Sequence, residues 1–241
     1  MTSDGAFLTA SAEDYLKAVY EIEQRGGAAS TNDLAQLLGV APASVSGMVR
    51  RLAEQGLIAH EPYRGARLTT AGRLAALRTL RRHRVIETYL VRAHGYSWDR
   101  VHEEAERLEH AASDALVDRM AEAVGEPEVD PHGAPIPTRD GAMDETRRAS
   151  LAELAPGARA TVSRVKDEDA SLLRYLAEQG IRPGAVVAVV ERAPFDGPLR
   201  LQVDGVERTV GAPVAAMVLV EQGAGGRGSA YRRSGRPARP T

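Results

Sequence analysis

Apolar positions recur at helical spacing through the first part of the chain and predict three helices before residue 57. The first runs from Ala12 to Gln24, and the second runs from Asn32 to Leu38 with Thr31 as its N-cap. The third begins at Pro42, a residue that suits an early helix position, and ends near Gly56. The second and third helices, joined by a short turn, predict a helix-turn-helix.

Two short strands after the third helix predict a wing. They are Leu57 to Glu61 and Ala66 to Thr69, joined by the turn from Pro62 to Gly65. Nine arginines against three acids between Thr31 and Arg84 favour duplex DNA over a docked protein as the partner. The residues predicted to contact DNA are Pro42, Ala43 and Gly47 near the bases, Ser44, Ser46, Arg50 and Arg51 at phosphates, and Tyr63, Arg64 and Arg67 in the wing.

A long helix is predicted from Thr70, taken as the N-cap, to about His94, followed by an acidic helix that ends near Gly125. Two long helices beside a wing are typical of a dimer interface. A dimer would also hold two recognition helices about 34 Å apart, so that both reach one face of a palindromic DNA site. We therefore expect a homodimer.

The last part of the chain alternates apolar and polar residues with the period of strands. Around one helical insert from Ser171 to Gln179, five short strands predict a small β-barrel. Glycine, arginine, serine and proline dominate beyond Glu221, so residues 222–241 are predicted to be a disordered basic tail. The predicted strands are Ala160 to Val165, Val186 to Glu191, Leu199 to Val203, Val206 to Val210 and Ala216 to Val220.

Composition narrows the class of protein. The 241 residues include 31 basic and 33 acidic ones, and 43% are hydrophobic, as in a soluble globular protein. The chain has no cysteine, which excludes a disulfide framework and a thiolate metal site. Because it has neither a signal-like start nor a run of about 18 apolar residues, we expect a cytoplasmic protein without a membrane partner.

Carboxylates and imidazoles gather on one face of the predicted acidic helix. Glu106, Glu109 and His110 fall at i, i+3 and i+4, and His102 lies one turn earlier on the same stripe. Between Asp99 and Asp130 eleven acids face three arginines, a balance that favours a cation as ligand. A Glu-rich helix is often only a solvated face, so the triplet alone leaves both interpretations open.

Further candidate ligands strengthen the metal hypothesis. His83 and Glu87 form another i, i+4 pair on the neighbouring helix, so two helices offer suitable donors. Asp130 and His132 lie in a proline-rich turn, where a lone histidine is otherwise usually solvated. Together these residues predict a protein that binds both a divalent metal and DNA.

Four motifs, in this order and spacing, resemble those of a known family. They are Ala12 to Leu16, Arg81 to Arg84, Val101 to His110, and Asp130 to Gly133. Over residues 8–221 the chain resembles the diphtheria-toxin-repressor and iron-dependent-repressor family, and most closely its manganese-responsive, MntR-type members. The resemblance implies a mainly α protein with a small β part. Its domains would be a winged helix-turn-helix DNA-binding domain at 8–72, a helical metal-binding and dimerisation domain at 73–148, and an SH3-like (FeoA-like) β-barrel at 155–221.

The resemblance also implies a primary metal site. Its ligands would be Asp14, His83, Glu106, Glu109 and His110. Carboxylate oxygen and imidazole nitrogen suit Mn²⁺, which is the expected cofactor, with Fe²⁺ as the alternative. Some manganese-responsive members have a glutamate where this chain has Lys17, a difference that argues against a tight dinuclear cluster.

An ancillary site is implied as well, and it would join the long helix, the proline-rich turn and the barrel. Its ligands would be Glu87, Asp130, His132 and Asp169, with His102 as an alternative ligand and Asp167 or Glu168 as alternatives to Asp169.

A metal-linked population shift is the mechanism that these features favour. Without metal, Asp14, His83, Glu106 and Glu109 would concentrate negative charge between the first helix and the dimer helices, and the repulsion would loosen the DNA-binding domains. A bridging metal would fix these domains at the half-site spacing. Ligation needs neutral imidazoles, so activation should weaken as pH falls through about 6.5. The resemblance implies a repressor of metal homeostasis, in particular of manganese uptake genes, that binds palindromic operator DNA as one dimer or two.

Other hypotheses lead to different expectations. A hydrolase or oxidase could use similar ligands, but no separate nucleophile or general base is evident, so we expect neither enzymatic activity nor a small-molecule substrate. An iron-dependent repressor of the same family is one alternative. A winged-helix regulator with a small organic effector would keep its response after Asp14→Ala, and a constitutive architectural DNA binder would ignore a chelator.

Overall fold

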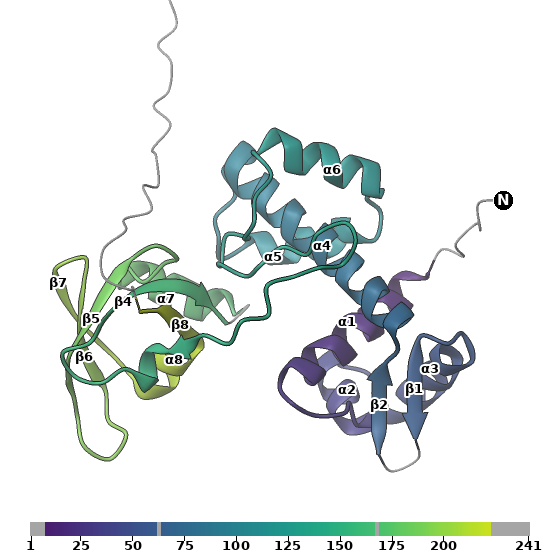
Figure 1. Cartoon of the computed structure of the whole chain (residues 1–241), viewed down its shortest axis with the longest axis horizontal. Helices are drawn as coiled ribbons and strands as arrows, with labels where there is room; N and C mark the ends of the chain where they lie inside the picture. The colour runs from purple at the N-terminus through teal and green to yellow at the C-terminus, as the bar shows by residue number, and fades with distance from the viewer. Residues whose placement is uncertain (1–7, 62–63, 167–168, 223–241) are drawn as a thin grey trace, which may run out of the picture. The chain divides into compact units, whose positions relative to one another are not determined.

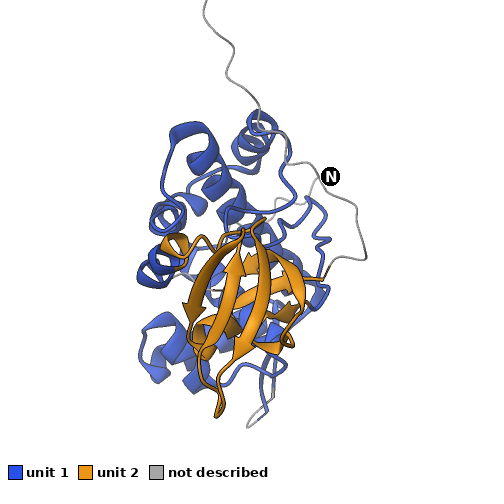
Figure 2. Cartoon of the chain, turned by 90° about the vertical axis from the view of Figure 1, so that its left-hand side faces the viewer, with its two compact units in different colours: residues 1–147, 167–175 blue, residues 148–166, 176–241 orange. Residues whose placement is uncertain are grey.

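A computed structural model describes residues 8–61, 64–166 and 169–222. The chain divides into two compact units, residues 1–147 with 167–175, and residues 148–166 with 176–241 (Figure 2). Among the described residues, no helix combines the length and the apolar character needed to cross a bilayer. The first unit contains both the predicted winged helix and the predicted metal-binding helices, so their side chains can be compared directly.

The predicted winged helix-turn-helix is confirmed at the start of the first unit (Figure 1). The cap of the second helix is Ser30, one residue before the predicted Thr31, because Ser30 and Asp33 form a capping box in which each side chain binds the other's backbone N–H. Gly39, with φ of 64°, ends this helix in the left-handed region. The elements are α1 (Ala10–Gln24), α2 (Thr31–Leu38), α3 (Pro42–Glu54), β1 (Ile58–Glu61) and β2 (Gly65–Leu68), the two strands being antiparallel.

One apolar core holds the winged helix together and continues into the next helix. Leu16, Leu34, Val45 and Leu52 are fully buried in it, one or more from each of the first three helices. Ala76 and Leu77, from the following helix α4 (Thr70–His94), pack into the same core. The DNA-binding elements and the start of α4 therefore share one hydrophobic cluster, which couples their positions.

The acidic region does not form the single helix that was predicted to end near Gly125. It forms α5 (Val101–Glu109) and α6 (Asp114–Ala123), because the hydroxyl of Ser113 accepts the backbone N–H of Leu116 and caps a new helix. The extent predicted for α4 is confirmed, but Thr69 rather than Thr70 is its N-cap. The break lets α5 present its carboxylates independently, while α6 packs its Val117 with Val85 of α4.

The second unit confirms the predicted small β part. Its strands form one antiparallel sheet in the order β3-β8-β4-β5-β6-β7, and no ladder among the described residues joins β7 to β3. The predicted strand from Ala216 begins only at Val218, because residues before it form a short helix, α8 (Ala212–Met217), with Pro213 in its first turn. The unit's other elements are β3 (Ala149–Ser150), η1 (Leu151–Glu153), β4 (Arg159–Val165), β5 (Val186–Arg192), β6 (Leu199–Val203), β7 (Val206–Val210) and β8 (Val218–Glu221). Helix α7 (Ala170–Glu178) begins in the first unit and ends in the second.

Gly72 sets how closely the start of α4 approaches the wing. A Cβ atom at this position would lie 1.9 Å from the carbonyl oxygen of Leu57, so Gly72→Ala is expected to destabilise the fold by about 1–3 kcal/mol. Gly47 is the matched control, because a Cβ there meets nothing within 4 Å and the exposed helix position should gain about 0.5–1 kcal/mol from alanine. Urea unfolding in chelator gives the free energy of unfolding of both variants. A Gly72→Ala variant as stable as wild type would contradict this close approach.

Candidate metal centre and nucleic-acid interface

Acidic and imidazole side chains from α1, α4, α5 and the turn after α6 meet in the first unit. Within the part of the chain that the structure describes, four sets of three have donor atoms within 4.8 Å of one another. The sets are Asp14, Glu109 and His110; His83, Glu106 and Glu109; His83, Glu87 and His102; and Glu87, Asp130 and His132. All five predicted primary ligands occur in these sets, but no single set contains them all.

Asp14 of α1 meets the end of α5, and we name Asp14, Glu106, Glu109 and His110 the α1–α5 cluster. The Nε2 atom of His110 lies 2.9 Å from Asp14 Oδ1 and 3.5 Å from Glu109 Oε1. Glu109 is fully buried, whereas the Asp14 side chain is 40% exposed. The cluster thus combines carboxylates and an imidazole at the junction of the DNA-binding helices with α5.

Glu13 and Arg82 support this cluster, and the sequence analysis missed both. Glu13 Oε2 lies 2.6 Å from His110 Nδ1, which leaves Nε2 facing Asp14. Arg82 pairs with Glu13 and donates from Nε to the backbone carbonyl of Glu109 at 2.9 Å. A carboxylate that orients a ligand histidine through its other nitrogen is a common feature of metal sites. The signal available in the sequence was the carboxylate adjacent to Asp14.

Lys17 lies within the α1–α5 cluster. Its Nζ donates to Glu109 Oε1 at 2.8 Å and to Glu106 Oε1 at 3.0 Å. Burial would lower the pKa of Lys17, but the attraction of Glu109 and Glu106 outweighs it and holds the pKa above its usual value. We predicted that repulsion among these carboxylates loosens the metal-free protein. In this form the prediction is wrong, because the ammonium group of Lys17 offsets part of their charge.

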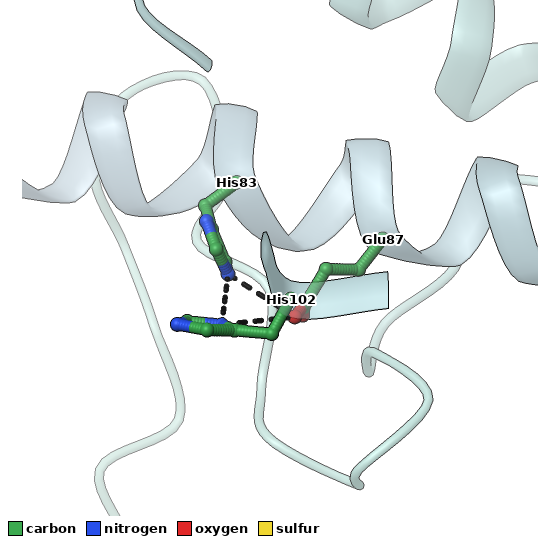
Figure 3. A group of neighbouring side chains, drawn as sticks. All are labelled: His83, Glu87 and His102. Carbon is green, nitrogen blue, oxygen red and sulfur yellow. Dashed lines mark hydrogen bonds and ion pairs between the residues drawn. The ribbon is translucent and has the colours of Figure 1, made fainter. Parts of the chain in front are cut away.

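His83 joins the α1–α5 cluster to a second set of side chains, and it does so through its two ring nitrogens. Its Nδ1 lies 2.5 Å from Glu109 Oε2, and its Nε2 lies 3.1 Å from Glu87 Oε1 and 3.0 Å from His102 Nδ1. Figure 3 shows His83, Glu87 and His102 converging on one point. One imidazole that binds a metal through Nε2 can still donate Nδ1–H to a carboxylate, so this geometry places His83 with Glu87 and His102.

The turn after α6 brings Asp130 and His132 to the other side of Glu87. His132 Nδ1 lies 3.8 Å from Glu87 Oε2, and its Nε2 lies 2.7 Å from the carbonyl oxygen of Trp98. Asp130 Oδ1 accepts the backbone N–H groups of His132 and Ala134, which fixes the turn. We name His83, Glu87, His102, Asp130 and His132 the Glu87 cluster.

Asp169 does not enter any of the four sets, although it was predicted as an ancillary ligand. Its Oδ1 accepts the backbone N–H of Ser171 at 2.7 Å and so caps the start of α7. Carboxylates are favoured at helix N-termini, which gives Asp169 a local structural role. Its proposed alternatives, Asp167 and Glu168, lie outside the described residues.

Buried charges shift the pKa values of the Glu87 cluster. Burial alone would lower the pKa of His83, but the charge of Glu87 and the hydrogen bond to Glu109 raise it to about 9. Burial also opposes protonation of His132, yet the hydrogen bond and charge of Glu87 raise its pKa to about 9. Burial would raise the pKa of Glu87, but the positive charge of His83 holds it well below its usual value.

These shifts predict that the metal-free protein loses stability as pH rises from 6.5 to 9. Each imidazole pKa is raised on folding, so its contribution is complete below the unfolded value of 6.5 and disappears as pH passes about 9. The free energy of unfolding, measured by urea titration in chelator, should fall across this window. The double variant His83→Gln, His132→Gln should show a flatter profile, and a flat wild-type profile would contradict the assignment.

The donor chemistry of both clusters fits a hard divalent cation. The donors are carboxylate oxygens and imidazole nitrogens, and the chain contains no cysteine. Such ligands suit Mn²⁺ and Fe²⁺ rather than the softest metals. Glu87 and Glu109 are buried, and burial of unpaired carboxylates is costly, so both need a cationic partner.

The described residues predicted to contact DNA lie on the exposed face of α3, on β2 and, at Arg64, in the turn just before β2. Pro42, Ala43, Ser44, Ser46, Gly47, Arg50, Arg51, Arg64 and Arg67 are all exposed, while Tyr63 lies outside the described residues. The open space at Gly47 shows that the fold does not require glycine there, which agrees with close approach of another molecule. The side chain of Arg50 is 82% exposed, and the 3.8 Å between its Nε and Glu54 Oε1 makes a long ion pair on the surface. The guanidinium can therefore reach outward.

Comparison with known families covers almost all of the described chain. Residues 7–66 match the family described as "Iron dependent repressor, N-terminal DNA binding domain". Residues 69–138 match "Iron dependent repressor, metal binding and dimerisation domain", and residues 149–222 match "FeoA domain". The first two matches therefore contain every residue of the α1–α5 cluster and the Glu87 cluster.

The relatives include repressors named as iron-dependent and as manganese-dependent. The iron-dependent repressor IdeR of Mycobacterium leprae is 31% identical over 195 residues, which are 76% of this chain and 84% of that protein. The HTH-type transcriptional regulator MntR of Lysinibacillus sphaericus is 35% identical over 116 residues, 48% of this chain and 83% of that protein. A solved structure of a manganese-dependent transcriptional repressor in complex with manganese is 40% identical with a TM-score of 0.80, covering 88% of this chain and 99% of that one.

Proposed function

The chain belongs to the iron-dependent repressor family of metal-dependent transcriptional repressors, and on that premise we propose that it is a manganese-activated repressor acting as a homodimer. The family resemblance and the fold class predicted from the sequence are thus confirmed. Relatives named as repressors and regulators support a protein without a catalytic role.

The observation that carries the proposal is the contact between Asp14 of α1 and His110 at the end of α5. Asp14 belongs to α1, which packs into the core of the winged helix, whereas His110 and Glu109 belong to the helical segment that the dimerisation family model matches. A divalent cation held here would replace a weak, partly exposed contact with strong bonds between the two segments. The angle of the recognition helix α3 would then be fixed relative to the dimer, which is what operator spacing requires.

The two clusters have different parts in this proposal. The α1–α5 cluster would hold the activating ion, through Asp14, Glu106, Glu109 and His110. The Glu87 cluster would hold an ancillary ion on α4, α5 and the turn, with Asp130 and His132 completing it. His83 lies between them, so that occupation of one cluster alters the hydrogen bond that His83 offers to Glu109 of the other.

Manganese is favoured over iron by the donor atoms. Neither cluster contains sulfur, and Mn²⁺ accepts oxygen-rich sets readily. The manganese-bound relative supports this choice, while IdeR supports iron as the second candidate. Ligation needs neutral imidazoles, and the raised pKa values of His83 and His132 mean that binding at neutral pH releases protons.

Operator DNA would be bound through α3 and the wing. Arg50, Arg51, Arg64 and Arg67 supply charge for phosphates, and the small residues Ala43 and Gly47 allow close approach to bases. The match to a dimerisation domain supports two such surfaces per dimer, with one dimer or two on a palindromic operator. Genes for manganese uptake are the proposed targets.

The proposal predicts DNA binding that depends on Mn²⁺. Affinity for fragments of the protein's own promoter region should be about 5- to 150-fold higher with Mn²⁺ than in chelator at the same salt concentration, as expected for a metal coupled to binding by 1–3 kcal/mol. Fe²⁺ under anaerobic conditions and Zn²⁺ are the comparison metals. Restoration by Fe²⁺ alone would favour the iron alternative, and equal binding in chelator would refute metal activation.

A further inference from the structure

Lys17 is the one ammonium group within the described part of the α1–α5 cluster. It lies on α1, one helical turn after Asp14, and its side chain is only 21% exposed. The chain has just two lysines, Lys17 and Lys166, and its other basic residues are arginines. A lysine among the proposed ligands is therefore unusual in this chain, which has arginine at nearly every other basic position.

The ammonium engages an oxygen that a metal at this cluster would need. Glu109 Oε1 accepts from Lys17 at 2.8 Å, and the same oxygen is the one 3.5 Å from Nε2 of His110. The other oxygen of Glu109 is engaged by His83 at 2.5 Å. An ion bound by Asp14, Glu109 and His110 thus has to compete with Lys17 for Glu109.

We infer that Lys17 is a built-in counter-cation of the α1–α5 cluster, which holds α1 against α5 without metal and which a metal ion must displace to bind. This inference rests on the proposed function, since it concerns the same cluster. It makes Lys17 the residue that sets the metal concentration at which the protein responds. A lysine suits displacement, because it is a compact charge on a flexible stem, whereas an arginine would grip a carboxylate through two parallel hydrogen bonds.

The charge of the cluster agrees with this role. Asp14, Glu106 and Glu109 carry three formal negative charges. With the positive charge of Lys17 and a neutral His110, two net negative charges remain. One divalent ion balances these two charges while the ammonium remains nearby. The ammonium therefore disfavours a second ion in the same cluster by direct repulsion.

A merely structural lysine and a displaced counter-cation lead to opposite outcomes when the charge is removed. Both roles of Lys17 predict that Lys17→Met lowers the thermal stability of the metal-free protein, by about 2–4 °C for a chain of this size. A structural lysine predicts unchanged or weaker metal binding, because the ligands lose their arrangement. A displaced counter-cation predicts tighter metal binding, because the metal no longer competes with an ammonium group for Glu109.

The experiment is calorimetric titration of the full chain with Mn²⁺ at one pH and salt concentration, together with thermal unfolding in chelator. We expect Lys17→Met to bind Mn²⁺ about tenfold more tightly than wild type, a change of about 1.4 kcal/mol. Lys17→Arg should not bind it more tightly, and Lys166→Met, at the exposed second lysine, should match wild type in both measurements. Equal or weaker binding by Lys17→Met would overturn the inference.

Asp14→Ala separates this inference from the proposed function. If Asp14→Ala weakens Mn²⁺ binding while Lys17→Met fails to strengthen it, only the inference about Lys17 is wrong. If Asp14→Ala leaves all Mn²⁺ binding unchanged, the α1–α5 cluster is not a metal site, and the proposed function and the inference fail together.

Discussion

Glu109→Gln is expected to abolish metal-dependent DNA binding, so that the variant loses the whole gain in operator affinity, about 5- to 150-fold, that Mn²⁺ is expected to give the wild type. Glu109 is fully buried and belongs to two of the four sets of donor atoms. Its carboxylate binds both Lys17 and His83, so the neutral amide removes a proposed metal ligand and the anion that these cations face.

The same substitution should also destabilise the metal-free protein. Breaking a buried ion pair by neutralising one partner typically costs about 3–5 kcal/mol, because the remaining charge is left buried without compensation. The pKa of Glu109 is consistent with this: burial would raise it, but the hydrogen bond from His83 and the charge of Lys17 hold it below its usual value. This contribution is present above pH 4.5 and is lost as pH falls below it.

Both effects can be measured on one preparation, by urea unfolding in chelator and by operator binding with Mn²⁺ at low temperature, where the variant stays folded. Glu104→Gln is the matched control on the same helix, because Glu104 contacts Arg107 at 3.5 Å and is partly exposed. The control should resemble wild type in both measurements. A Glu109→Gln protein that is folded and still responds to Mn²⁺ would remove the α1–α5 cluster from the mechanism.

Asp14→Ala is expected to separate metal binding from DNA binding. Asp14 belongs to one of the four sets of donor atoms, and it is the residue of α1 that enters any of them among the described residues. Its loss therefore removes the proposed bridge between the DNA-binding helices and α5. The Glu87 cluster contains no atom of α1 and should still bind metal. DNA affinity should then be about 5- to 150-fold below that of the metal-loaded wild type and insensitive to Mn²⁺.

Trp98 offers a direct measurement of the Glu87 cluster in this variant. It is the only tryptophan in the chain, and its ring stacks on that of His132 with 5.6 Å between the ring centres. Mn²⁺ near His132 should quench Trp98 fluorescence in both wild type and Asp14→Ala, while His132→Gln should reduce the quenching. If Asp14→Ala retained a full DNA response to Mn²⁺, the metal would not activate the protein through the α1–α5 cluster.

The local pattern of the sequence was enough to predict most elements and the main donors. The bounds of α4 and of strands β6 and β7 follow from apolar periodicity, because each segment has one face that must be buried. Glu106, Glu109 and His110 were predicted to share a face because helix geometry alone puts i, i+3 and i+4 together. The break between α5 and α6 was missed, because an acidic periodic run continues through Ser113 and only the cap at this residue ends it.

The sequence by itself determined which side chains lie on one helix face, and so it predicted that metal ligands, a winged helix and a β domain occur in this chain. Only the tertiary structure decided how the donors are shared: the two nitrogens of His83 face different carboxylates, Glu13 orients His110, and Lys17 lies between Glu106 and Glu109. The physical reason is that residue spacing fixes neighbours along one helix. Contacts between α1, α4 and α5 depend instead on the distance and angle at which these helices pack, which the whole core determines.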